Sequence, residues 1–228
     1  MVAMGKSNWS NPLDIPTYLP HKSGVFKRLS EFSAPEISYR TANYMKFTFV
    51  RHPFERLLSA YRNKFQLNDS DSVGYFRDRY GKHIVQTYRS HPSNESLERG
   101  DDVTFQEFVQ YIIDPKTTEG AVYNEHWTPM SELCQPCKID YDIVGKYETL
   151  NDDAWLVLDR ANLSRLVQFP QSETVLATGK LVDHYLQNLT DRQLFSLYRV
   201  YESDFKLFDF QFEPAKWAAA RGESLTGQ

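Results

Sequence analysis

The sequence lacks the signatures of several large protein classes. It contains no G-x-x-x-x-G-K-[ST] motif, so the phosphate cradle and the Mg²⁺-binding hydroxyl of ATP-hydrolysing enzymes and kinases are missing. No run approaches the roughly twenty apolar residues of a membrane span, and the start has no basic-then-apolar signal pattern, so we expect a soluble chain as it stands. The net charge of −4 argues against a general nucleic-acid binder.

Cysteine is also scarce. Cys134 and Cys137 are the only cysteines, and their C-x-x-C spacing fits a disulfide, half of a zinc site or a redox pair. Zinc would need His126 and another ligand, because no second cysteine pair completes a tetrahedral site. A redox pair would need a following helix, whereas Pro136 and the residues after it predict a loop and then a strand. We therefore expect a short structural disulfide formed in an oxidising compartment, and no metal.

The N-x-[ST] pattern, in contrast, is frequent. Such sequons are acceptors for N-glycosylation in secreted and lumenal proteins, although each three-residue pattern alone is a weak signal. Together with the expected disulfide they predict a glycoprotein of the secretory lumen. The sequon asparagines are Asn8, Asn68, Asn94, Asn162 and Asn188.

The composition predicts one α/β domain over residues 1–228. A chain of 228 residues can bury one substantial core, and 41% hydrophobic with 14% aromatic residues is typical of a globular protein. Residues 45–50 and 141–145 have the β-branched and aromatic character of strands. Helix-starting capping boxes are predicted at Ser33 to Glu36, Thr104 to Glu107 and Thr190 to Gln193, and a further helix at 151–160.

Alternating strands and helices imply a parallel sheet flanked by helices, in which ligands bind outside the carboxyl ends of the strands. The apolar stripes of the later helices are expected to be core rather than cofactor contacts. The segment 66–100 is polar and predicts loops and a helix. The stripe residues are Phe105, Phe108, Val109, Ile112, Leu194, Leu197, Tyr198 and Tyr201.

The segment 46–65 is the most informative part of the chain. An apolar strand is followed by a short turn and by a basic amphipathic helix that has Pro53 in its first turn. A helix amino terminus attracts anions, and Arg51 adds a planar fork of donors suited to phosphate oxygens. Ser59 lies about two turns further on. The alternative is an ordinary amphipathic helix whose basic residues face solvent.

The pattern R-x-P-F-E-R-L-x-S-A-Y that begins at Arg51 resembles the 3′-phosphate-binding motif of Golgi carbohydrate sulfotransferases. The resemblance is to the group of chondroitin 4-O-, dermatan 4-O- and HNK-1 sulfotransferases, and most of all to the first of these. Other blocks agree: N-E-H-W from Asn124, L-C-Q-P-C, Y-D-I-V-G-K-Y-E from Tyr141, and the closing L-Y-R-V-Y-E-S-D-F from Leu197. The resemblance covers nearly the whole chain.

One departure concerns the start of the chain. Family members carry a strand and a P-K-x-x-C-[ST]-N-W-K-R loop, whose lysine grips the 5′-phosphosulfate end of the donor. The residues around Lys6 echo this loop only weakly, and the better alignment starts from Asn11 to Pro16 and His21. On that alignment Lys6 is a solvated lysine. The resemblance thus implies a P-loop-NTPase-like parallel sheet that lacks the first strand and this loop, as in an N-terminally truncated catalytic domain.

The resemblance implies transfer of a sulfuryl group from 3′-phosphoadenosine 5′-phosphosulfate (PAPS) to a glycan hydroxyl, on a GalNAc of chondroitin or dermatan. It places the 3′-phosphate on Arg51, Ser59 and the backbone between them. His52 takes a position that is usually acidic in the family and adjoins the phosphate site. The implied donor-binding residues are Arg51, His52, Pro53, Phe54, Glu55, Arg56, Leu57, Leu58 and Ser59.

The catalytic base is assigned to His126, because a neutral imidazole suits proton abstraction near neutral pH. The competing interpretation is a structural histidine, and Glu125 and Glu148 are weaker candidates. Arg56 is interpreted as a salt-bridge or acceptor-facing group. Family members are Golgi membrane enzymes of proteoglycan biosynthesis, so a lumenal location is implied, with an anchor only in a full-length form. A noncatalytic nucleotide- or glycan-binding relative and a nucleotide kinase-like enzyme are the other hypotheses.

Overall fold

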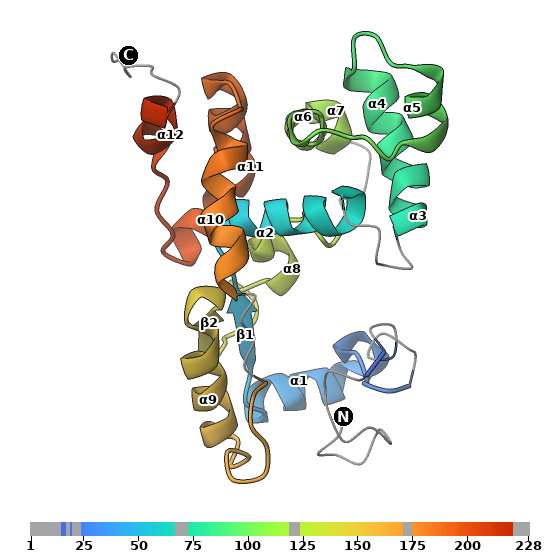
Figure 1. Ribbon diagram of the computed structural model, residues 1–228. Coiled ribbons are helices and arrows are strands. Elements are labelled where there is room, and N and C mark those ends of the chain that lie inside the picture. Colours follow the sequence, from blue (N-terminus) through green and yellow to red (C-terminus); the bar gives the residue numbers. More distant parts are fainter. Residues whose placement is uncertain are drawn as a thin grey trace. The chain divides into compact units, whose positions relative to one another are not determined.

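The computed structural model describes residues 15, 16, 19, 24–66, 73–118, 124–170 and 175–220 (Figure 1). The chain divides into two compact units. Unit 1 consists of Met1–Val50 and Pro136–Glu173, and unit 2 of Arg51–Gln135 and Thr174–Gln228. Four predicted residues fall outside the described ranges: Lys6, Asn8, His21 and Asn68. Of the predicted segment Asn11 to Pro16, only residues 15 and 16 are described.

Unit 1 contains the parallel sheet. In the described ranges, β1 (Phe47–Val50) pairs with β2 (Ile143–Lys146) in parallel, and Phe47 lies opposite Ile143. This confirms the α/β class and both predicted strands, each slightly shifted at its ends. The other elements are η4 (Leu29–Glu31), α1 (Ala34–Asn43), η7 (Tyr147–Thr149) and α9 (Leu150–Arg160), which lies alongside β2 in Figure 1.

Local hydrogen bonds explain where these elements begin. The Ser33 hydroxyl and backbone N–H donate to the Glu36 carboxylate at 2.7 and 3.0 Å, which confirms the capping box of α1. Asp142 accepts from the Lys46 backbone N–H at 2.7 Å and pairs with its ammonium at 3.2 Å. These bonds lower the pKa of Asp142, the backbone bond most of all. They fasten the start of β2 to the start of β1.

Gly145 of β2 faces Phe49 of β1, and a Cβ there would lie 2.6 Å from a ring carbon of Phe49 and 3.1 Å from the Asp153 Cβ. We therefore expect Gly145→Ala to lower the free energy of unfolding by about 1–3 kcal/mol, because a methyl group must displace the ring. Urea unfolding measures this change. The control is Val144→Ala on the same strand, where the side chain is 46% exposed. Equal effects of both substitutions would show that the close contact does not matter.

Unit 2 is helical and holds the larger core. Its first helix, α2 (Pro53–Tyr61), runs into a π-helical turn, η5 (Arg62–Gln66). The other elements are α3 (Val73–Phe76), the π-helical η6 (Arg77–Gly81), α4 (Lys82–Tyr88), α5 (Asn94–Arg99), α6 (Phe105–Ile113), α7 (Pro115–Thr118), α8 (Met130–Cys134), α10 (Val175–Leu186), α11 (Asp191–Leu207) and α12 (Pro214–Ala220).

The core of unit 2 confirms the predicted apolar stripes. Trp127 is fully buried and meets the rings of Tyr80 and Phe108 edge to face. The predicted capping boxes of α6 and α11 are both present. The stripe residues Phe105, Phe108, Val109, Ile112, Leu194, Leu197 and Tyr201 are buried, and Tyr198 packs against them half-buried.

The described residues of the segment 66–100, which are 66 and 73–100, are more helical than their polarity predicts. Its apolar residues recur every three or four positions, and Phe76, Tyr80 and Ile84 are buried in the core of unit 2. The polar residues between them form the outer face of α3, η6, α4 and α5. Gly100 ends α5 with a left-handed φ of 60°, and its carbonyl lies where a Cβ on Gly81 would stand.

Several chemical expectations can be compared with the described residues. No disulfide joins Cys134 and Cys137, so that prediction is wrong for this structure; Cys134 ends α8, and Gln135 turns the chain away with a left-handed φ of 49°. The described residues contain no cluster of three or more His, Cys, Asp or Glu suited to a metal. Within the same ranges, none of the helices combines the length and apolar character that crossing a bilayer requires. The sequon side chains Asn94, Asn162 and Asn188 are all exposed.

Candidate functional site

A cavity of about 270 Å³ in unit 2 brings the main predicted site residues together. Arg56, Ser59, Ala60 and Asn63 line it at helical spacing, so one face of α2 and its continuation forms one wall. Glu125 and His126 form another part of the lining. The full lining is Arg51, Arg56, Ser59, Ala60, Asn63, Lys64, Glu125 and His126.

The amino terminus of α2 has the features of an anion site. Pro53 occupies the first turn, and the side chain of His52 at the N-cap makes no capping hydrogen bond. The Arg51 Nε and Nη2 atoms both lie 3.4 Å from one carboxylate oxygen of Glu55, one helical turn further on. Two contacts of this length orient the guanidinium loosely.

The side chains between Arg51 and Ser59 serve mainly the core. The His52 ring packs edge to face against Phe54, Phe205 and Phe210, with Nε2 3.5 Å from the Gln211 carbonyl oxygen. The sequence interpretation assigned the backbone between Arg51 and Ser59 to the donor site, and that assignment stays a prediction. The side chains of Pro53, Phe54, Leu57 and Leu58 are buried, so these four residues can offer a ligand only their backbone groups.

Arg56 holds the segment that carries His126. Its Nη1 donates to the Thr128 carbonyl and its Nη2 to the Glu125 carbonyl, both at 2.6 Å, so the two bonds bracket His126 and Trp127. Burial lowers the pKa of Arg56, and Tyr201 and Asp204 oppose that effect. Arg56 is therefore a positioning residue, which sequence patterns alone do not reveal.

The segment 124–128 is also fixed by its own turn and by α11. The Asn124 carbonyl accepts from the backbone N–H groups of Trp127 and Thr128, and the Asn124 side chain accepts from the His126 N–H at 3.1 Å. The Tyr201 hydroxyl donates to the Trp127 carbonyl at 2.6 Å. The His126 ring lies 5.6 Å from the ring of Phe76, half-buried at the cavity wall.

Lys64 is one of the basic residues of the segment 46–65 and was not among the implied donor-binding residues. Its side chain lines the cavity although the residue is only 8% exposed, and its Nζ lies 4.6 Å from the centre of the Phe76 ring. Burial lowers the pKa of Lys64, and the nearby Glu125 opposes that effect. Lys64 lies four residues after Ala60 and eight after Arg56, so it continues the lining face of α2 into η5.

Of the weaker base candidates, Glu125 lines the cavity and Glu148 does not. Glu148 belongs to η7 of unit 1, whereas every lining residue belongs to unit 2. The cavity thus gathers three cationic side chains, a hydroxyl, an amide, a carboxylate and an imidazole. Such a set can bind a phosphate or sulfate group beside a proton acceptor.

Comparison with known proteins identifies the class of protein to which this site belongs. The sulfotransferase family matches residues 2–211, and the chain belongs to that family. Among curated relatives, it is 44% identical to carbohydrate sulfotransferase 11 of Mus musculus over 211 residues, which are 92% of this chain and 59% of the relative. It is 36% identical to carbohydrate sulfotransferase 14 of Danio rerio, over 90% of this chain and 56% of that protein.

A third relative is carbohydrate sulfotransferase 8 of Homo sapiens, at 36% identity over 90% of this chain and 51% of the relative. The chain therefore spans between half and three fifths of the length of these curated relatives. No solved structure matches it. The family assignment therefore rests on sequence similarity.

Proposed function

We propose that this chain forms the 3′-phosphate-binding and acceptor-activating part of a carbohydrate sulfotransferase that uses PAPS as the sulfate donor. The observation that carries the proposal is the cavity in which Arg51 and Ser59 lie with Lys64 and His126. These side chains fit a phosphate and a sulfuryl group, because they supply ammonium, guanidinium and hydroxyl donors beside an imidazole. The family membership supports the same chemistry.

In the proposed mechanism, Arg51 and Ser59 hold the 3′-phosphate of the donor. The His126 imidazole takes the proton from an acceptor hydroxyl, whose oxygen then forms a bond to sulfur. The bond between sulfur and the 5′-phosphate oxygen breaks, and its electron pair leaves with 3′,5′-ADP. Arg56 contributes by holding the His126 segment through its two carbonyl contacts. Positioning and positive charge supply most of the catalysis in such in-line transfers.

Lys64 supplies positive charge where the reaction needs it. In this chain, we assign the charge facing the sulfuryl end of the donor to Lys64, the ammonium that lines the cavity. Removing one preorganised donor of this kind typically lowers a rate on the order of a hundredfold.

The finer assignments follow the family resemblance. We infer a parallel sheet of the P-loop-NTPase type, a single catalytic domain, an acceptor GalNAc in chondroitin or dermatan, and a Golgi lumenal location in proteoglycan biosynthesis. The named relatives are carbohydrate sulfotransferases, which supports a glycan as the acceptor.

Titration with 3′,5′-ADP by calorimetry tests the donor site. We expect Arg51→Ala to weaken binding by about one to two orders of magnitude, since a hydrogen bond to a charged group contributes about 1.5–3 kcal/mol. Ser59→Ala removes a neutral donor, so a smaller loss of about threefold to tenfold is expected. The control is Arg99→Ala, whose side chain on α5 is 60% exposed.

Each outcome of this titration has a distinct meaning. Loss of affinity in the Arg51 and Ser59 variants alone supports the proposal, and sulfate transfer from PAPS to desulfated chondroitin is then the next assay. Binding without transfer would favour the noncatalytic relative. If well-folded wild-type protein does not bind 3′,5′-ADP, the donor site is wrongly assigned for this chain.

A further inference from the structure

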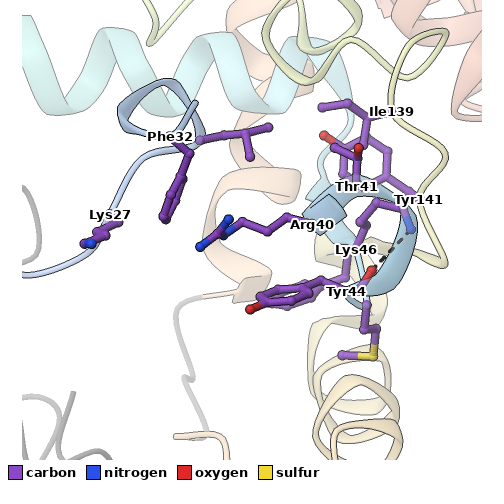
Figure 2. A pocket seen from close by; sticks show the side chains of 11 residues that line it. Lys27, Phe32, Arg40, Thr41, Tyr44, Lys46, Ile139 and Tyr141 are labelled. Atoms are coloured by element: carbon purple, nitrogen blue, oxygen red, sulfur yellow. Dashed lines mark hydrogen bonds between the residues drawn. The ribbon is translucent and has the colours of Figure 1, made fainter. Parts of the chain in front are cut away.

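Unit 1 contains a second and larger cavity, of about 610 Å³, formed by α1, the start of β1 and residues near Tyr141. In Figure 2, the Arg40 guanidinium extends between the rings of Phe32 and Tyr44. All lining residues belong to unit 1, so none of them takes part in the cavity around His126. They are Lys27, Leu29, Phe32, Arg40, Thr41, Tyr44, Met45, Lys46, Phe47, Ile139 and Tyr141.

The charged side chains that line this cavity are all positive. They are Lys27, Arg40 and Lys46, and no carboxylate is among the lining residues. Lys46 pairs with Asp142 at 3.2 Å, but that carboxylate is 43% exposed and itself accepts a backbone bond. The nearest carboxylate oxygen to Arg40 is that of Glu36 at 3.7 Å, and Glu36 also closes the capping box of α1. The cavity therefore keeps a positive surplus that an anionic ligand would complement.

The remaining walls are aromatic and open to solvent. The Arg40 guanidinium lies 3.6 Å from the centre of the Phe32 ring and 5.9 Å from that of Tyr44, which holds its donors in place. The Tyr44 and Phe47 rings are 56% and 48% exposed. Exposed rings pack against the apolar faces of sugar rings, while fixed cations bind the carboxylates or sulfates that acidic sugars carry.

We propose that the unit 1 cavity binds an acidic sugar segment, such as a uronate-containing stretch of a glycosaminoglycan. In Figure 2, Lys27 and Lys46 lie on opposite sides of Arg40, so the cations are spread along the cavity. A chain with charges at intervals fits this spread better than a nucleotide, whose phosphates need converging donors. The glycan class rests on the proposed function, whereas the site itself is separate from the transfer cavity. It gives the protein a second contact with a polymeric acceptor.

The test measures binding of a desulfated chondroitin hexasaccharide by calorimetry at low salt. We expect the double variant Lys27→Gln, Arg40→Gln to weaken binding tenfold or more and to reduce its dependence on salt, while the affinity for 3′,5′-ADP stays unchanged. The matched control is Arg28→Gln, an exposed neighbour that does not line the cavity. A double variant that binds the hexasaccharide as tightly as wild type would overturn the proposal.

A second measurement needs no variant. The same hexasaccharide with its uronates reduced to neutral sugars should bind wild-type protein far more weakly; equal binding of both would refute recognition by charge. Because Arg51→Ala affects only the other cavity, it should leave hexasaccharide binding nearly intact. If wild-type protein binds the hexasaccharide but does not bind 3′,5′-ADP, only the proposed donor site is refuted. If the double variant loses more affinity for 3′,5′-ADP than for the hexasaccharide, the glycan assignment is overturned.

Discussion

Replacing His126 with alanine is expected to lower the rate of sulfate transfer by about 10²- to 10⁴-fold while 3′,5′-ADP binding stays within about threefold. General-base catalysis by a positioned imidazole contributes a factor of this size. His126 lines the cavity that contains Arg51 and Ser59, and its backbone N–H is held by Asn124 at 3.1 Å. The measurement is single-turnover transfer to desulfated chondroitin, with donor binding followed separately.

The pH dependence of the rate distinguishes a base from a structural histidine. If His126 takes the proton, the wild-type rate falls at acid pH as the imidazole becomes protonated, and this acid limb disappears in His126→Ala. His91→Ala is the control, because that histidine is exposed between α4 and α5. A variant that keeps both the rate and the acid limb would leave Glu125 as the candidate base. Loss of 3′,5′-ADP binding in His126→Ala would instead assign the residue to the donor.

The parts that could be predicted from sequence are those that depend on near neighbours. The capping boxes of α1, α6 and α11 involve residues three positions apart, so the pattern alone locates them. The strand before Arg51 and the helix after it were predicted for the same reason. The assignment of Arg51, Ser59 and His126 to one site was a prediction from the motifs of a family. Spacing along the chain alone does not predict contacts between α2 and residue 126.

The parts that sequence could not supply depend on tertiary packing. Arg56 looks like one more basic residue on a helix, and only the folded chain shows that it donates to the carbonyls of Glu125 and Thr128. The His52 ring packs among Phe54, Phe205 and Phe210, and two of these lie more than 150 residues further along the chain. The burial of Lys64 beside the Phe76 ring, with its side chain in the cavity lining, likewise depends on the folded chain.

Replacing Asp204 with alanine is expected to lower the free energy of unfolding by about 3–5 kcal/mol, a large effect for a single residue. Asp204 is 2% exposed, and its two carboxylate oxygens accept from the backbone N–H groups of Met130 and Ser131 at 2.7 and 2.8 Å. Each hydrogen bond to a charged acceptor contributes about 1.5–3 kcal/mol, and removing the carboxylate leaves both donors without it. The start of α8 then loses its attachment to α11.

Urea unfolding of Asp204→Ala and of the milder Asp204→Asn measures this contribution, and hydrogen exchange at the Met130 and Ser131 amides locates it. Asparagine keeps one acceptor oxygen, so its effect should lie between those of wild type and alanine. The matched control is Glu202→Ala on the same helix, whose surface pair with Lys206 should matter little. Arg56 and Tyr201 hold residues 125–128 independently of Asp204. Faster exchange confined to α8 would therefore mean that His126 stays in place. Faster exchange that reaches His126 would make Asp204 a positioning residue for the candidate base, and unchanged stability would show that the buried carboxylate is dispensable.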